Sequence, residues 1–345
     1  MKLTLIIMST FVLLPLSSMA FCLQTFNAYG PIYAPSLKQR TQLLNTALKQ
    51  ESPCEIIHFQ EVWNPDHQNE LEKILLNVYP DHQTINPSKN DRIGLISSLA
   101  LKVESTTTQI FRINKSGLLD EIRDLASVKK AFTVIETVID HQPFLIINTH
   151  LHPTSTEVRI AQIVQIMHYR IAHPDKILIL SGDLNIAPFE IEHVLLRDGF
   201  GMTDAQFEVR KTYDGICSYC SKNPRSWMWE DKVFDYVFYQ KNRNTKMTFN
   251  AIKADINLRG TNEMPLSDHY GLRIDFDWQP TTAPTQAQDI IAYAKSLSAI
   301  NQAIEMLKND PKKFEVPLGI LKTWYKELEN KNPHSNFVKI WNNYY

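Results

Sequence analysis

Short apolar runs alternate with amphipathic stretches through the first half of this chain, which indicates a fold that mixes strands with helices. Residues 37–48 carry leucines at helical spacing, whereas Ile177–Leu180 is a short apolar run typical of a buried strand. Phe132–Ile139 and Phe144–Thr149 flank a short turn and predict a hairpin. This mixture favours an α/β protein in which two sheets pack face to face with helices outside. We also expect residues 92–98 and 100–113 to form paired strands.

The two ends of the chain differ in character from the middle. Residues 1–20 begin with Lys2, continue with an apolar run over Leu3–Leu16 and end in small residues before position 21, as a secretory signal does. The alternative is a membrane anchor, but the apolar run is shorter than the roughly 20 residues that a membrane span needs. We therefore predict a secreted or periplasmic protein cleaved near Ala20. A linker at residues 280–285 then separates a catalytic domain, 21–280, from a helical extension, 281–345.

Export gives the four cysteines of the chain a structural meaning. Cys22 and Cys54 each open a predicted strand and could bridge if these strands are parallel neighbours. Cys217 and Cys220 can bridge locally; half of a zinc site is the alternative, but no second Cys or His pair completes it. Four cysteines allow three pairings, and the pattern alone does not choose between them.

Composition restricts the partners of the protein. Of 345 residues 43% are apolar, enough for a large core, and the formal net charge is −1. The chain has no excess of basic residues of the kind that would indicate a nucleic-acid partner. That observation argues only weakly against a nuclease, because a bound metal can supply local positive charge.

Polar clusters follow several of the apolar runs, and together they predict a site for a hard cation and a phosphate. They are Asn27, Gln60-Glu61, Asn148-Thr149-His150, Gly182-Asp183-Leu184-Asn185 and Ser267-Asp268-His269, with Asp235 inside a strand. Glu61 and Asn27 offer the oxygen ligands that suit Mg²⁺. Taken singly, each cluster can also be read as an ordinary turn, loop or strand end.

The residue types suggest roles within such a site. His269 can take a proton from water, and Asp235 is a candidate for the acid that orients its ring, since an unpaired carboxylate in an apolar strand would be costly. His150 can donate to a phosphate or leaving oxygen. Asp183 could orient the attacking water, and Asn185 could bind the phosphoryl oxygen. His152 is expected to be structural.

The order of these clusters resembles the exonuclease/endonuclease/phosphatase superfamily over about Leu23–Trp278. The resemblance implies a four-layer α/β sandwich and Mg²⁺-dependent attack on phosphorus, with Mn²⁺ or Co²⁺ as substitutes. It implies Glu61 as metal ligand with Asn27 and Asp268 nearby, and His269 as base. It also implies Asp183 and Asn185 as water and phosphate contacts, and His150 as transition-state donor.

Further stretches are similar to neutral sphingomyelinases within that superfamily. Asp124 and Lys129 match their Asp-x-x-x-x-Lys element, which implies substrate binding, although Lys130 stands where Gly is usual. Residues 92–98 and 157–162 are similar to other segments of those enzymes. The resemblance implies a monomer that cleaves sphingomyelin, a choline sphingolipid at a membrane surface, into ceramide and phosphocholine.

Two other functions remain open at this point. A secreted nuclease would use the same residues, with basic side chains along a groove; the residues to inspect are Arg225, Arg243, Lys246 and Arg259. A scaffold without activity is the third hypothesis, although an idle site has no need of so many polar residues. Trp227-Met228-Trp229 is either a membrane-contacting tip or the start of a core strand.

Overall fold

Two mixed β-sheets form the centre of the molecule. The computed structural model describes residues 21–31, 33–87, 92–114, 128–240, 247–280 and 286–330. Within this part of the chain, the first sheet has the order β11-β12-β1-β2-β4-β3 and the second has the order β5-β6-β7-β8-β10-β9. The first sheet consists of β1 (Phe21–Asn27), β2 (Ile56–Gln60), β3 (Gln83–Ile85), β4 (Ile96–Leu99), β11 (Met247–Asn257) and β12 (Gly271–Pro280). The second consists of β5 (Val103–Ile110), β6 (Ala131–Ile139), β7 (Gln142–His150), β8 (Ile177–Asp183), β9 (Thr203–Asp204) and β10 (Asp235–Tyr239).

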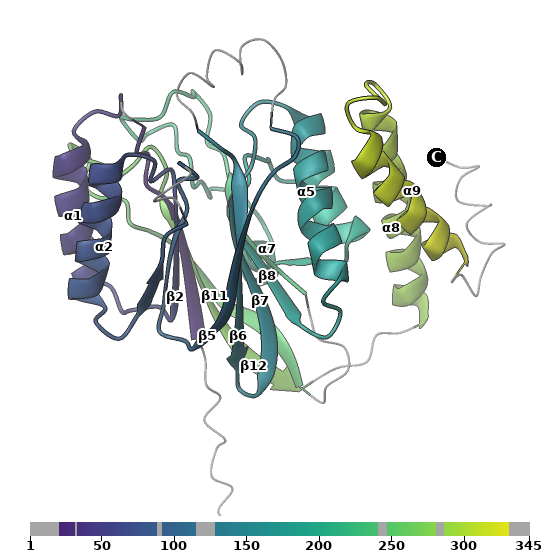
Figure 1. Cartoon of the computed structure of the whole chain (residues 1–345), viewed down its shortest axis with the longest axis horizontal. Helices are drawn as coiled ribbons and strands as arrows, with labels where there is room; N and C mark the ends of the chain where they lie inside the picture. Colours follow the sequence, from purple (N-terminus) through teal and green to yellow (C-terminus); the bar gives the residue numbers. More distant parts are fainter. Residues whose placement is uncertain are drawn as a thin grey trace, which may run out of the picture.

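Helices cover the outer faces of both sheets, so the four-layer α/β sandwich is confirmed. Figure 1 shows α1 and α2 outside one sheet, α5 outside the other, and α8 and α9 beyond α5. The described helices are α1 (Leu37–Gln50), α2 (Pro65–Val78), α5 (Thr156–Ile171), α6 (Ile191–Val194), a π-helical turn (Leu195–Gly199), α7 (Ala205–Arg210), α8 (Gln286–Leu307) and α9 (Glu315–Asn330). Asn64 caps α2, as a polar residue directly before a helix that starts with Pro65 is expected to do. Its side chain accepts hydrogen bonds from the backbone N–H groups of Asp66 and His67. Ser36 precedes α1, but its side chain makes no capping bond.

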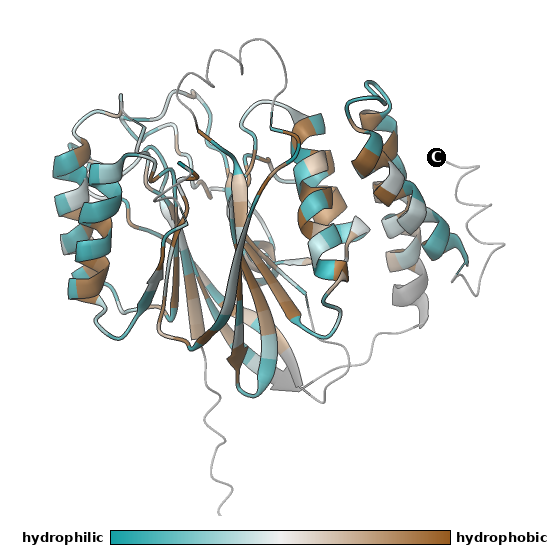
Figure 2. Ribbon diagram, in the orientation of Figure 1, coloured by the Kyte–Doolittle hydropathy of each residue, from teal (hydrophilic) through white to brown (hydrophobic). Residues whose placement is uncertain are grey.

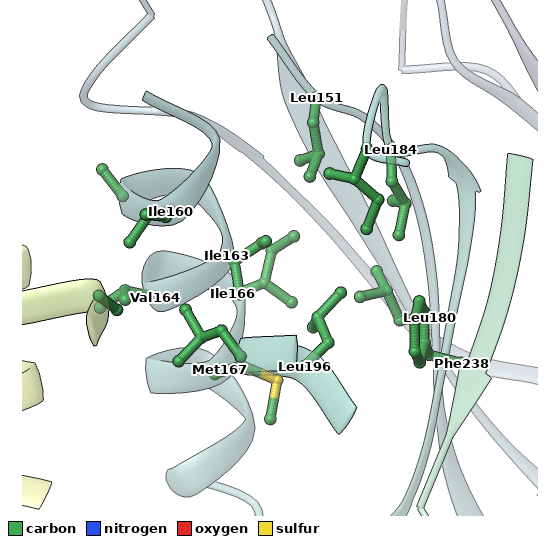
Figure 3. Packing of buried hydrophobic residues seen from close by; sticks show 14 of the residues in the cluster. Leu151, Ile160, Ile163, Val164, Ile166, Met167, Leu180, Leu184, Leu196 and Phe238 are labelled. Carbon is green, nitrogen blue, oxygen red and sulfur yellow. The ribbon is translucent and has the colours of Figure 1, made fainter. Parts of the chain in front are cut away.

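Alternation along the strands separates the core into layers. In β7, Phe144 and Ile146 face the other sheet, whereas Leu145 and Ile147 join the cluster under α5. Figure 2 shows hydrophobic residues along α5, which lies between the sheet and the helices α8 and α9. Figure 3 shows Ile163, Ile166 and Met167 of this helix facing the sheet. Both faces of the sheet are thus buried, which is why its central strands read as continuous apolar runs.

The extension helices pack on the same layer. Ile300 and Leu307 of α8 and Leu321 of α9 are buried in the cluster that α5 shares with the second sheet. The described parts of the predicted helical extension are therefore helices, α8 and α9. The domain boundary at 280 stays a prediction.

One predicted strand pairing is wrong. β4 pairs with β2 and β3 in the first sheet, whereas β5 pairs with β6 in the second. The chain crosses from one sheet to the other at residues 100–102. Both segments were predicted from residue types that favour extended structure, and such a preference does not choose a partner strand.

Both proposed disulfides are present. Cys22 joins Cys54, and Cys217 joins Cys220. The first bridge follows from topology, since β1 and β2 are parallel neighbours and both cysteines lie at their amino ends. Such bonds persist in oxidising surroundings and are in keeping with an extracellular environment. Within the described residues, no helix combines the length and apolar character needed to cross a membrane.

Candidate active site

The polar clusters meet at one end of the sandwich because strand direction and register bring them there. In the parallel pairs, Asn27 lies opposite Gln60, and His150 lies opposite Asp183. β10 runs antiparallel to β8, so its first residue, Asp235, also lies opposite Asp183. Asp268 and His269 come just before β12, which runs antiparallel to β1. All these residues except half-buried Glu61 are buried, so their charges interact in a medium of low polarity.

His269 is held by a carboxylate on one side and an aromatic ring on the other. Its Nδ1 atom lies 2.7 Å from Oδ2 of Asp235, and its Nε2 atom lies 3.7 Å from Oδ2 of Asp183. The Tyr219 ring packs edge-on against the imidazole at 5.0 Å. Burial lowers the pKa of His269, but the Asp235 and Asp183 carboxylates outweigh it and raise that pKa well above its usual range. The predicted His269–Asp235 pair is thus brought together.

Asp183 lies at the centre of the cluster. Its Oδ2 atom accepts a hydrogen bond from the Asn27 amide at 2.8 Å, and its Oδ1 atom accepts one from the backbone N–H of Asn185 at 3.0 Å. Burial raises its pKa to about 6. Asn185 has a positive φ of 53°, so the chain does turn after β8, and its side-chain amide donates to the carbonyl of Leu151.

The strand bend at Asp183 depends on the preceding glycine. Gly182 has φ 139°, and a Cβ atom there would lie 1.9 Å from the carbonyl oxygen of Thr149 on β7. Any other residue would push β8 away from β7. Since His150 and Asp183 are partners in this strand pair, Gly182 sets the spacing between them.

Glu61 leaves β2 in a left-handed conformation, with φ 60°. Its Oε1 atom lies 3.7 Å from Nε2 of His150. Burial and the nearby Asp268 carboxylate raise the pKa of Glu61 to about 7, and Lys130 opposes them. Two carboxylates that repel each other in a buried site are the kind of oxygen donors that a divalent cation stabilises. Glu61, His150 and Asp183 also bring one potential metal-binding atom each within 4.8 Å of one another.

The turn before β12 places Asp268 through its own hydrogen bonds. The Ser267 hydroxyl donates to Oδ1 of Asp268 at 3.1 Å. The Asn223 amide donates to the carbonyls of Ser267 and Asp268, which ties the turn to the loop closed by the Cys217–Cys220 bridge. Burial raises the pKa of Asp268.

Two residues that sequence reasoning missed stand beside His150. The Lys130 ammonium lies 2.6 Å from Nε2 of His150, and the Trp63 indole stacks on the imidazole at 5.9 Å. Lys129 is exposed at the neighbouring position, and Asp124 lies outside the described residues. One indication in the sequence that Trp63 belongs to the site is that it lies two residues after the metal-ligand candidate Glu61.

The remaining polar candidates have structural surroundings. Asn148 donates to the carbonyls of Phe59 and Ile96 and accepts from Gln60, so it joins the two sheets. His152 accepts from the backbone N–H groups of Thr154 and Ser155 ahead of α5, as expected for a structural residue.

The fold and this cluster together define a metal-dependent hydrolase of phosphoric esters. The sequence matches the profile of the Endonuclease/Exonuclease/phosphatase family over residues 25–285, and the chain belongs to this family. Members of the family are metal-dependent phosphodiesterases and phosphatases, so the protein is an enzyme of the phosphoric diester hydrolase class. No curated protein matches the sequence.

Solved structures with different substrates share the fold. The complex of D. rerio TDP2 with a single-strand DNA product is 16% identical with a TM-score of 0.60, over 75% of this chain and 99% of that one. Sphingomyelinase C from Streptomyces griseocarneus is 14% identical with a TM-score of 0.54, over 74% of this chain and 99% of that one. SmcL has the same identity and TM-score, over 75% and 99%. At these identities the similarity establishes the fold alone.

Proposed function

We propose that this protein is a secreted, Mg²⁺-dependent sphingomyelin phosphodiesterase that releases phosphocholine and leaves ceramide in the membrane. The observation that carries this proposal is an aromatic tip, Trp227-Met228-Trp229, beside the catalytic histidine. The two tryptophan residues are 79% and 98% exposed, and Met228 is 44% exposed. The alternative of a core strand start is therefore wrong. Exposed tryptophans next to a site are suited to the interfacial region of a lipid bilayer.

The tip is attached to the site through Tyr219. The backbone N–H of Trp227 donates to the Tyr219 hydroxyl at 2.7 Å, and the same ring packs against His269. A membrane that receives the tip therefore meets the molecule close to the catalytic cluster. The phosphodiester of a lipid in that membrane, which lies in the polar interfacial region, would then be close to His269.

The roles in the reaction follow the geometry of the cluster. His269 Nε2 takes a proton from the water that attacks phosphorus in line, while Asp235 holds Nδ1 of the same ring. Asp183, near Nε2, orients the water, and Asn185 and His150 face the phosphoryl and leaving oxygens. Glu61, Asn27 and Asp268 would hold Mg²⁺, or Mn²⁺ or Co²⁺ in its place. The ion would neutralise charge that develops on the phosphorus-bound oxygens.

A nuclease remains the second candidate, since exposed tryptophans can also stack on unpaired bases. The basic residues do not support it strongly. Arg225 contacts the Pro265 carbonyl and the Met264 sulfur, and Arg259 lies over the Tyr270 ring. Arg243 and Lys246 lie outside the described residues.

The test is Mg²⁺-dependent phosphocholine release from sphingomyelin vesicles, with plasmid nicking measured in parallel. We expect release by the wild type and a loss of several powers of ten, on the order of 10³-fold or more, in both His269→Ala and Glu61→Ala. Nicking without lipid hydrolysis would move the protein to the nucleases. Near-normal rates in either variant would remove the catalytic assignment.

A further inference from the structure

We propose that Lys130 supplies the cationic contact to the phosphoryl oxygens of the substrate, and that His150 and Trp63 position its ammonium group. This inference rests on the proposed function, because it concerns the same site. It departs from the resemblance to sphingomyelinases, which pointed to Lys129 one residue earlier.

Three side chains form the support. The Lys130 ammonium donates to Nε2 of His150 at 2.6 Å and lies 5.7 Å from the centre of the Trp63 ring. The Trp63 and His150 rings stack at 5.9 Å with an interplanar angle of 23°. A lysine held between an imidazole nitrogen and an indole face has its ammonium restricted to a small region.

That region borders the centre of the catalytic cluster. The same Nε2 atom of His150 lies 3.4 Å from Oδ2 of Asp183 and 3.7 Å from Oε1 of Glu61. An oxygen of a phosphate held near these carboxylates through a cation would therefore come within reach of the Lys130 ammonium.

The chemistry of the two groups fixes the direction of the hydrogen bond between Lys130 and His150. An ammonium group has only donors, so Nε2 of His150 must accept and the ring is neutral in this arrangement. The proton available to an incoming oxygen at this point is thus on Lys130. His150, which the resemblance implies as the transition-state donor, acts in this arrangement as the acceptor that orients the ammonium group.

The backbone around Lys130 is fixed by neighbouring strands. The Lys130 carbonyl accepts from the N–H of Phe111 at 3.1 Å, and the next carbonyl, of Ala131, accepts from the Thr149 hydroxyl at 2.9 Å. Trp63 is fixed as well, because its indole N–H donates to the carbonyl of Ile93 at 3.3 Å. Lys129, by contrast, has an exposed side chain.

Charge gives the reason for a cation at this place. The carboxylates of Glu61, Asp183, Asp235 and Asp268 share one buried cluster, and a phosphodiester adds a further negative charge. Arg40, a buried cation nearby, donates to the backbone carbonyls of Ala28, Tyr29, Pro35 and Leu266, so it holds the loops in place. Lys130 is placed to offset the charge of the substrate.

The two adjacent lysines allow a matched experiment. We would compare Lys130→Met, Lys130→Arg and Lys129→Met in the presence of Mg²⁺, by calorimetric binding of inorganic phosphate and by kcat and KM on bis(p-nitrophenyl) phosphate. Methionine removes the charge but keeps an unbranched side chain of similar length, and a circular dichroism spectrum and melting curve would check folding.

We expect Lys130→Met to weaken phosphate binding and lower kcat/KM by about 10- to 100-fold, the value of a hydrogen bond to a charged group. Lys130→Arg should recover part of both, and Lys129→Met should change either by less than about fivefold. Unchanged phosphate binding in Lys130→Met, equal losses in Lys130→Met and Lys130→Arg, or a larger loss in Lys129→Met would overturn the proposal.

The phosphate measurement separates this inference from the proposed function. A wild type that binds phosphate through Lys130 and cleaves the soluble diester, but leaves sphingomyelin intact, would remove the lipid assignment alone. Phosphocholine release that survives unchanged in Lys130→Met would remove the role of Lys130 alone.

Discussion

Asp183 and Asp235 face each other across the β8–β10 pair, yet their partners give them different tasks. Asp235 lies against Nδ1 of His269 at 2.7 Å, so it fixes the ring orientation and the tautomer that leaves Nε2 free to accept a proton. Asp183 accepts from Asn27 and Asn185 and has both His150 and His269 within 3.7 Å of Oδ2. Of the two carboxylates, only Asp235 is placed as an acid that orients the His269 ring.

Asp235→Asn should therefore reduce kcat for phosphodiester hydrolysis by about 10² to 10⁴-fold while the fold is retained, because an amide favours the wrong tautomer. Steady-state kinetics on bis(p-nitrophenyl) phosphate would measure it. Asp255→Asn is the matched control, since this carboxylate is 42% exposed on β11 and pairs with Lys253. An Asp235→Asn enzyme as fast as the control would mean that His269 is not the base.

Much of the site could be predicted from sequence at this scale, because a polar residue directly after an apolar run marks the end of a strand. Asn27, Glu61, His150 and Asp183 were found in this way. Lys130 was not, because neither of two adjacent lysines carries a signal of burial. The choice between them depends on how the chain enters β6, which the contacts of Phe111 and Thr149 determine.

At the scale of elements, the loop between α7 and β10 joins the catalytic histidine to the surface. The Cys217–Cys220 bridge closes its first part, Ser218 accepts from the backbone N–H of Asp235, and Tyr219 contacts both His269 and Trp227. Periodicity predicted the neighbouring strands but not this loop, because its order comes from single side-chain contacts and a disulfide.

Replacing both Trp227 and Trp229 with alanine should weaken binding to sphingomyelin vesicles by about 10- to 100-fold, as two exposed indoles lose their place in the interface. Vesicle sedimentation would measure the effect. Leu76→Ala provides the control, because Leu76 is also an exposed apolar residue, 66% accessible, but lies near the far end of α2. Equal vesicle binding in the double variant and the control would exclude the tip as the membrane contact.

At the scale of the whole molecule, buried polar contacts join the two sheets behind the site. Nδ1 of His58 on β2 lies 2.6 Å from the Ser181 hydroxyl on β8, and the Gln60 amide donates to Oδ1 of Asn148 on β7 at 2.8 Å. Alternation predicted two apolar faces here. It did not predict that the interior of the sandwich becomes polar towards the catalytic end. Each of these polar residues, taken alone, only disfavours a buried strand position.

The buried histidine of this junction should make the fold sensitive to acid. Burial lowers the pKa of His58 from 6.5 to about 3 in the folded chain. Between these values the unfolded chain binds a proton that the folded chain excludes, so the free energy of unfolding decreases as the pH falls from 6.5 towards 3. The loss attributable to His58 approaches about 1.4 kcal/mol per pH unit inside that window and vanishes above it.

Urea unfolding with chelator present, from pH 7 to pH 4.5, would test this on the oxidised protein. His58→Gln does not titrate and should show a shallower decline than the wild type, even if it is less stable at pH 7. His141→Gln, at an exposed histidine between β6 and β7, should keep the wild-type slope. The carboxylates of the site act in the opposite direction, because their raised pKa values let the folded chain bind protons that the unfolded chain releases. Parallel stability curves for the wild type and His58→Gln would therefore show that the junction admits a proton without opening and that His58 does not set the acid sensitivity of the fold.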